Sequence, residues 1–179
     1  MKTENETIKI LKTRRSVRKY QSQQITEEEL KAVLEAGTYA PTSRGQQNPW
    51  IVAVQDKDII AQLVKMNAHI LGTNSNPYYD APTIVLVFAS NTDIWPNAIQ
   101  DGSLVLGNMM NAAHAIGLAS CWIHREFEMF QTDEGKTLMK DFGLPDGLIG
   151  IGALALGYEA QGGSINPSPR KEKYYRIIK

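Results

Sequence analysis

The sequence predicts an α+β fold in which a central sheet carries helices on both faces. Helical and strand patterns are mixed along the 179 residues, a length that fits one compact domain or one subunit of a small oligomer. The patterns lack the strict alternation of a Rossmann domain, and no G-x-G-x-x-G follows the first expected strand, Ile51 to Val54. The continuous apolar run Ile84 to Phe88 is typical of a strand covered on both faces.

Capping signals predict where three helices of the first half begin. The signals are Thr3-Glu4-Asn5-Glu6, Thr26-Glu27-Glu28-Glu29, and either Asp56 or Asp58. The first helix is expected to end near Thr13, the second before Pro41 and the third near Leu71. In the second helix, apolar and small residues keep helical spacing, so one face packs inward; they are Leu30, Val33, Leu34 and Gly37.

The second half begins with a polar loop, Gly72 to Pro82, before the buried strand. After it we expect a mostly apolar helix from Asp101 to Ile116, ended by Gly117, and a short strand from Cys121 to Ile123. A further helix is expected to open at Thr132 and to be closed by Gly143 and Pro145, and a glycine-rich strand follows from Ile149 to Tyr158. The last segment is a charged tail, Pro167 to Lys179, with a strand-like Tyr174 to Ile178.

Composition excludes several classes of protein. Lysines and arginines number 19, as do aspartates and glutamates, so the net charge is zero, which argues against a general nucleic-acid or anionic-membrane binder. Met1 to Lys12 has no apolar h-region of a secretory signal. The apolar stretch Ser103 to Ile123 contains two asparagines and a histidine, which a membrane span would resist. We therefore expect a cytoplasmic protein without nucleic-acid or membrane partners.

A basic cluster consists of Arg14, Arg15, Ser16 and Arg18. In an extended segment, positions 14, 16 and 18 share a face, and arginine forks bind phosphate oxygens in pairs. A phosphate monoester, with nearly two negative charges, would need this many donors. The cluster alone fits a solvated basic turn equally well. A nucleic-acid patch with Tyr20 as the stacking aromatic is disfavoured by the zero net charge.

The segment Pro41 to Trp50 has prolines near both ends and many hydrogen-bonding side chains. Neutral donors and acceptors suit the edge of a heteroaromatic ring better than a bare ion. An ordinary surface loop is the alternative, although long ordered loops often carry binding sites.

Cys121 and His124 form a C-x-x-H pair, but there is no second cysteine, and the further histidines are His69 and His114 alone. We therefore expect no metal site and no disulfide. Cys121 lies in a strand pattern and is expected to be a buried thiol rather than a nucleophile. The other two histidines are expected to pack or lie at the surface of helices.

Taken in order, these motifs resemble the nitroreductase family of FMN enzymes over nearly the whole chain. They are Arg14-Arg15-Ser16 with Arg18, Ala40-Pro41-Thr42-Ser43 through Pro49-Trp50, Asn76 to Pro82, Asp101-Gly102-Ser103, Gly117 to Ile123, Gly152 to Tyr158 and Arg170. The resemblance implies a nitroreductase-like fold, with a central mixed sheet flanked by helices and a C-terminal tail reaching a partner subunit. It implies that residues 1–179 form a single FMN-binding domain, in a homodimer with FMN at the interface. The helix Asp101 to Ile116 is the candidate interface, or else a helix of the monomer core.

The resemblance also implies roles for individual residues. Arg14, Arg15, Ser16 and Arg170, with Lys171, would hold the flavin phosphate. The loop residues Ser43, Arg44 and Gln47 would approach the flavin from the partner subunit. Asn76 and the backbone of Trp122, Ile123 and His124 would meet the flavin ring. Arg18 would stabilise negative charge near N1 and O2 of the reduced ring, or else make a second phosphate contact or a surface salt bridge.

Two departures from the family pattern concern ring contacts and the acceptor pocket. Gly45 and Gln47-Asn48-Pro49-Trp50 stand where the family usually has an asparagine and then Gln-Pro-Trp. His124-Arg125-Glu126 stands where larger members carry an acidic-glycine flavin loop.

The implied function is a ping-pong cycle. NADH or NADPH delivers hydride to flavin N5 and leaves, and a nitroaromatic, quinone or similar acceptor takes its place. No protein acid or base is strictly required. The alternatives are a dehalogenase-like or flavin-cleaving enzyme on the same scaffold, and a non-catalytic flavin-binding redox sensor. The former need substrate-specific lids, and this short chain shows no large insertion.

Overall fold

One four-stranded sheet, in the order β1-β2-β4-β3, forms the centre of the molecule. A computed structural model describes residues 3–179 of the chain. The strands are β1 Trp50–Val54, β2 Thr83–Ser90, β3 Ala119–Ile123 and β4 Leu148–Gly157. Their ladders are antiparallel, and a parallel bridge between Ser16 and Ser120 at the β3 edge makes the pairing mixed.

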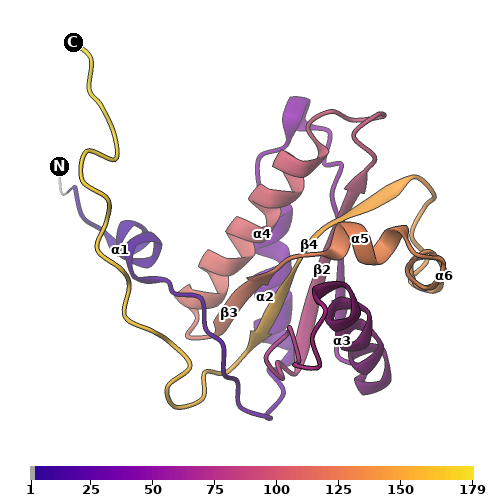
Figure 1. The fold of residues 1–179 in the computed structure, drawn as a ribbon. Helices are drawn as coiled ribbons and strands as arrows, with labels where there is room; N and C mark the ends of the chain where they lie inside the picture. The colour runs from indigo at the N-terminus through magenta and orange to yellow at the C-terminus, as the bar shows by residue number, and fades with distance from the viewer. Residues whose placement is uncertain (1–2) are drawn as a thin grey trace.

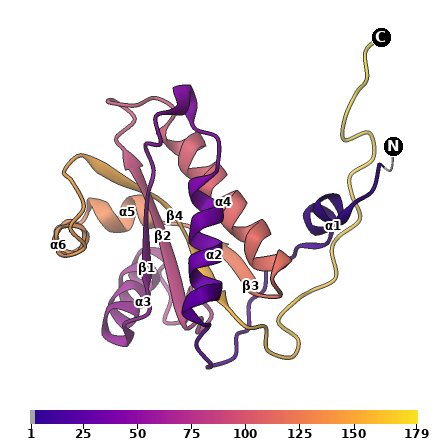
Figure 2. The same ribbon diagram turned by 180° about the vertical axis from the view of Figure 1, so that it is seen from behind.

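Helices cover both faces of this sheet (Figures 1 and 2). They are α1 Glu6–Thr13, α2 Glu27–Thr38, α3 Lys57–Leu71, α4 Ala98–Ala115, α5 Glu126–Gln131 and α6 Asp133–Asp141, with a 3-10 turn, η1, at Ser43–Gly45. The helices α2 and α4 lie on one face, and α3, α5 and α6 lie on the other. Both views also show α1 and the C-terminal tail standing away from the sheet. The predicted sheet with helices on both faces is confirmed.

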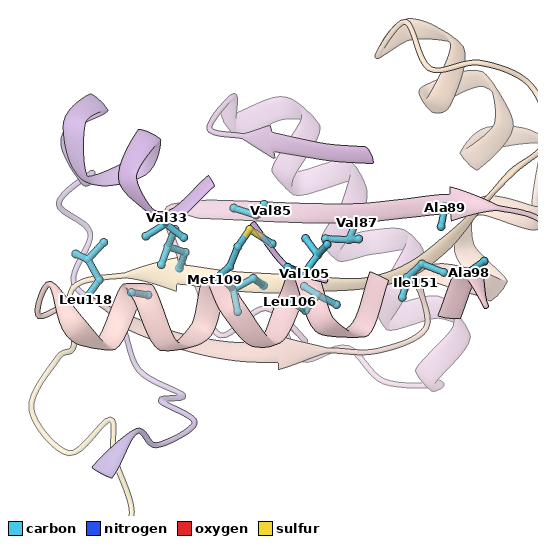
Figure 3. Packing of buried hydrophobic residues seen from close by; sticks show 14 of the residues in the cluster. Val33, Val85, Val87, Ala89, Ala98, Val105, Leu106, Met109, Leu118 and Ile151 are labelled. Carbon is cyan, nitrogen blue, oxygen red and sulfur yellow. The ribbon is translucent and has the colours of Figure 1, made fainter. Parts of the chain in front are cut away.

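Strand β2 separates two apolar cores. Val85, Val87 and Ala89 point to the α2–α4 side (Figure 3). The alternate residues Ile84, Leu86 and Phe88 belong to the core on the α3–α5–α6 side. All six are fully buried, so the predicted strand covered on both faces is confirmed.

The predicted inward face of α2 packs closely on α4. A Cβ atom added to Gly37 would lie 2.8 Å from Cγ of Met109, a separation that a larger residue could not keep. On α4, Leu106 and Met109 are fully buried, whereas Ile99 and Leu104 are about half exposed. Helix α4 is therefore a core helix that keeps one exposed apolar side. Among residues 3–179, none of the helices combines the length and apolarity that crossing a membrane requires.

Two of the predicted caps are placed as expected. In α2 the capping box is complete: the Glu29 amide donates to Thr26 Oγ1 at 3.2 Å, and the Thr26 amide donates to Glu29 Oε2 at 2.8 Å. For α3 the cap is Asp56, whose Oδ1 accepts two backbone amides at 3.0 Å.

The N-cap predicted at Thr3 is wrong. Asn5 caps α1, with its Oδ1 accepting the amide of Ile8 at 3.0 Å. Asparagine is at least as good a cap as threonine, and this choice starts the helix closer to its apolar residues.

Other parts of the fold also differ from the sequence prediction. Helix α4 begins at Ala98 rather than Asp101. The sequence does not predict α5, which is short and follows Arg125 in the left-handed region, without a side-chain cap. The strand-like segment Tyr174 to Ile178 forms no strand and is largely exposed. A strand needs a neighbouring strand for its hydrogen bonds, and residues 3–179 bring none to that segment.

Candidate functional site

The basic cluster and the C-terminal tail share a pocket of about 270 Å³. Arg14, Arg15, Ser16 and Arg18 form one side, and Arg170 with residues 165–168 forms the other. Residues 147 to 156 positions apart in sequence thus meet, because the tail runs back past α1 (Figures 1 and 2). Arg14, Arg15, Ser16 and Arg170 are residues that the sequence predicts to act together on a phosphate group, and Arg18, predicted to lie near the ring, lines the same pocket.

Arg14 carries an unpaired donor in this region. Its Nη1 atom is buried and has no hydrogen-bond partner among residues 3–179. Leaving a charged donor buried and unpaired costs about 1–3 kcal/mol or more, so an anion in the pocket would be stabilised there. Arg15 is already partly engaged, since its Nη1 donates to the carbonyl oxygens of Lys12 at 2.9 Å and Arg14 at 2.7 Å.

The backbone of the cluster is held in place on two sides. The Val17 amide donates to the Ser120 carbonyl at 3.1 Å, and the Arg18 amide donates to the Gly163 carbonyl at 3.0 Å. Because backbone hydrogen bonds join the segment Arg14 to Arg18 to β3 and to the start of the tail, it is an ordered extended stretch rather than a loose basic turn.

Arg18 links this pocket to the loop that contains Asn76. Its guanidinium lies 5.9 Å from the centre of the Tyr79 ring. The polar interaction with the Tyr79 side chain raises the pKa of Arg18 above its ordinary value, and Cys121 adds to the rise. Arg18 therefore remains a cation between the pocket and that loop.

Asn76 orders its own loop. Its Oδ1 accepts the Tyr78 amide at 2.8 Å, and its Nδ2 donates to Asp80 Oδ1 at 2.8 Å. The side chain is partly exposed, so this amide is fixed in orientation and lies at the surface of the loop.

The segment Trp122, Ile123 and His124 closes β3. Ile123 is buried in the α3 side core, and Trp122 packs against the other core. The side chain of His124 is exposed, while its carbonyl oxygen accepts from Asn67 Nδ2 at 3.0 Å. The backbone at this end of β3 is therefore anchored by α3.

The loop residues Ser43, Arg44 and Gln47 lie at the opposite end of α4. The Ser43 amide donates to Asp101 Oδ1 at 2.8 Å, in the first turns of that helix. Arg44 and Gln47 are exposed, with φ of 53° and 49°. The basic cluster lies instead beside His114, at the other end of the helix. Eighteen residues of helix span about 27 Å, so one chain does not bring these two groups together.

Lys171 is the one predicted phosphate contact that does not line the pocket. Its Nζ atom instead lies 5.3 Å from the centre of the Tyr174 ring, farther along the tail.

Cys121 is buried, as predicted, and burial raises the pKa of its thiol. His69 and His114 lie on helices, as predicted, and His114 Nε2 is 2.9 Å from Thr13 Oγ1. Among the residues that the structure describes, no three His, Cys, Asp or Glu side chains are grouped as a metal site would require.

Sequence reasoning does not identify one buried polar cluster, formed by Asn67, Tyr78 and Glu126. Its members come from α3, from the Asn76 loop and from the start of α5. No sequence motif or regular spacing predicts this cluster, because only the tertiary fold brings the three residues together.

Comparison with known proteins gives a consistent result. The model of the nitroreductase family matches residues 11–78 and 71–158. A protein of Archaeoglobus fulgidus, whose name marks it as a candidate NADH dehydrogenase/NAD(P)H nitroreductase, is 30% identical over 161 residues, covering 86% of this chain and 85% of that protein.

Solved structures have the same fold. A nitroreductase with bound FMN from Bacteroides fragilis has a TM-score of 0.89 at 29% identity, covering 98% of this chain and 100% of that one. A nitroreductase with bound FMN from Desulfitobacterium hafniense, at 19% identity, shows likeness of fold alone, with a TM-score of 0.88 and coverage of 99% and 100%. With the family match spanning most of its length, this chain belongs to the nitroreductase family.

Proposed function

We propose that this protein is an FMN-dependent oxidoreductase that passes hydride from NADH or NADPH, through the flavin, to a nitroaromatic, quinone or similar acceptor in a ping-pong cycle. The observation that carries the proposal is the buried, unpaired Nη1 of Arg14 beside a pocket that Ser16 and Arg170 also line. Relatives named as nitroreductases, and a similar structure with bound FMN, support it.

The residues of the pocket fit a phosphate monoester. The group carries up to two negative charges and three acceptor oxygens at neutral pH. Four arginines and two serines line the pocket, and arginine forks match the spacing of phosphate oxygens. In this proposal Arg14, Ser16 and Arg170 hold the phosphate. Arg15 stabilises the backbone at the end of α1 and contributes positive charge.

We assign the flavin ring to the side of the pocket toward Tyr79. When bound, FMN supplies the centre that accepts hydride and passes it on. Arg18, held beside Tyr79, supplies positive charge near the pyrimidine end of the ring. Asn76 offers an oriented amide, and the backbone from Trp122 to His124 forms a fixed edge.

We further propose that two copies of residues 1–179, each a single FMN-binding domain, share each site. Ser43, Arg44 and Gln47 lie too far along α4 to serve the pocket of their own chain, so the partner's copy would use them. The exposed apolar side of α4 supplies contact surface. The tail beyond Arg170 is rich in exposed apolar side chains and pairs with no strand in the described part of its own chain, so it would reach the partner subunit.

A spectrum tests this proposal directly. Protein purified with FMN and passed through a desalting column is expected to remain yellow and to lose its visible absorbance when NADH or NADPH is added without oxygen. Colourless protein that takes up no FMN would contradict the proposal. Flavin that binds but is not bleached by either nucleotide would indicate a redox sensor. Rates of reoxidation by a panel of nitroaromatics and quinones would then define the acceptor.

A further inference from the structure

Glu126 is a carboxyl group buried behind the edge proposed for the flavin ring. Glu126 is the first residue of α5, two residues after His124, and it is 1% exposed. A Cβ atom at Gly150 would overlap the carbonyl oxygen of Glu126, so β4 presses directly against its backbone. A carboxyl in such a place is costly unless it is neutral or well paired.

A chain of hydrogen bonds joins this carboxyl to the Asn76 loop and to α3. The Tyr78 hydroxyl donates to Glu126 Oε1 at 3.0 Å, and Asn67 Nδ2 donates to the Tyr78 hydroxyl at 3.3 Å. Tyr78 is fully buried, and its amide is the group that Asn76 Oδ1 accepts. Fixing Tyr78 therefore fixes the orientation of the Asn76 amide.

Asn67 extends the chain to the end of β3. The same Nδ2 donates to the His124 carbonyl at 3.0 Å, and Oδ1 accepts from Arg125 Nε at 2.8 Å. Arg125 has a φ of 90°, which is strained for a residue other than glycine. The cluster thus holds the strained turn in which the His124 backbone lies.

The charge balance favours an uncharged Glu126. Its Oε2 has no partner among residues 3–179. The titratable groups that face it are Tyr78, Arg125 and the neighbouring Glu128. Burial raises the pKa of Glu126 to about 8, because it outweighs the lowering effects of a backbone hydrogen bond, of Tyr78 and of Arg125.

We propose that Glu126, as an uncharged carboxylic acid, is a positioning residue for the flavin. Through Tyr78 and Asn67 it keeps the Asn76 amide and the His124 backbone in one fixed relation at the edge of the ring. This inference rests on the proposed function, since it assumes that these two segments meet FMN. Loss of the proton from Glu126 places an unpaired charge beneath both segments and loosens them.

The variant Glu126→Gln tests the proposal, because glutamine keeps the shape and the acceptor for Tyr78 but cannot ionise. The dissociation constant of FMN is measured from pH 6 to 9.5 for the wild type, Glu126→Gln and the control Glu35→Gln, which replaces an exposed carboxylate on α2. In the wild type and the control, affinity is expected to fall by up to about tenfold per pH unit above the pKa. In Glu126→Gln, this fall is expected to be absent.

Unfolding of the flavin-free protein reports the same titration independently. A raised carboxyl pKa means that the folded state holds the proton more tightly, so stability is lost as pH rises from the unfolded pKa toward about 8. The thermal midpoint of the wild type is expected to fall more between pH 5 and 8.5 than that of Glu126→Gln. Equal slopes would overturn the assignment of an uncharged carboxyl, even if FMN binds normally.

A second variant, Tyr78→Phe, keeps the test valid if Glu126→Gln does not fold. It removes the bridging hydroxyl and is expected to weaken FMN binding at every pH. Unchanged affinity in Tyr78→Phe, or a wild-type pH profile in Glu126→Gln, would overturn this inference and leave the proposed function standing. A wild-type protein that binds no FMN at any pH would overturn both.

Discussion

The two ends of α4 differ in how their polar groups are satisfied. At the C-terminal end, beside His114, the basic cluster includes a buried donor on Arg14 without an acceptor. At the N-terminal end, the loop around Ser43 is tied down within its own chain. Asp101 accepts both the Ser43 amide and the indole Nε1 of Trp95, each at 2.8 Å, and Asn97 Nδ2 donates to Ser43 Oγ at 2.8 Å.

This difference indicates two kinds of functional surface. At the C-terminal end, a buried donor of Arg14 has no acceptor among residues 3–179, and the proposed phosphate would supply one. The N-terminal end is a finished loop that presents Arg44 and Gln47 outward, with their backbones fixed at positive φ. A loop prepared in this way is suited to act on a site outside its own chain, as the proposed dimer requires.

The largest expected effect on stability comes from removing the Asp101 carboxylate, which anchors the loop around Ser43. Asp101→Ala leaves the Ser43 amide and the Trp95 indole without their acceptor, and each unpaired donor costs about 1–3 kcal/mol. We expect a loss of about 2–5 kcal/mol of unfolding free energy in urea titrations. The control Glu35→Ala, at an exposed site on α2, is expected to change stability by less than about 0.5 kcal/mol. Equal stability of Asp101→Ala and Glu35→Ala would contradict the role of Asp101 in anchoring the loop around Ser43.

The next effect concerns the unsatisfied end. Arg14→Ala removes a charged donor worth about 1.5–3 kcal/mol, so the dissociation constant of FMN is expected to rise about 10- to 150-fold. Lys12→Ala, a control two residues away in an exposed ion pair with Glu4, is expected to bind FMN like the wild type. Unchanged FMN affinity in Arg14→Ala would contradict the placement of the flavin phosphate in this pocket.

Mixed dimers of Arg14→Ala and Arg44→Ala chains sharpen the comparison. If each site takes Arg14 from one chain and Arg44 from the other, the mixed dimer contains one intact site and one doubly altered site. Titration with FMN is then expected to show one tight site per dimer, with the affinity of the wild type. Two altered sites, one lacking Arg14 and the other lacking Arg44, with no site of wild-type affinity, would mean that both residues serve the pocket of their own chain.

The smallest expected effect is a pH dependence at His114. Burial lowers its pKa, with Arg14 and Arg15 adding to the effect. The unfolded chain therefore binds the proton more readily, and stability present above the unfolded pKa of about 6.5 is lost as pH falls toward the folded value. His114→Gln is expected to remove this loss, which solvent screening limits to about 1 kcal/mol or less. Thermal midpoints between pH 5 and 7.5 would show it, and identical curves for the two proteins would contradict it.

Local patterns were sufficient for much of the fold. The cap at Thr26, the strand Ile84 to Phe88 and the helix end at Gly117 follow from side-chain chemistry within a few residues, and each is confirmed. At the first helix the capping-box pattern predicted Thr3 as the cap, whereas Asn5 caps the helix in the structure. Helix α5 went unpredicted because packing against β4 stabilises it, rather than any local cap.

By itself, the sequence determined which residues could bind an anion, because arginine forks at Arg14, Arg15 and Arg18 carry that chemistry wherever they lie. It also determined the α+β class, through the periodicity of its apolar residues. Only the tertiary structure decided which donors stay unpaired, that Arg170 rather than Lys171 returns to the pocket, and that α4 holds the polar loop at a distance. Burial and proximity are properties of the folded chain, so the unpaired Arg14 and the buried Glu126 became visible only there.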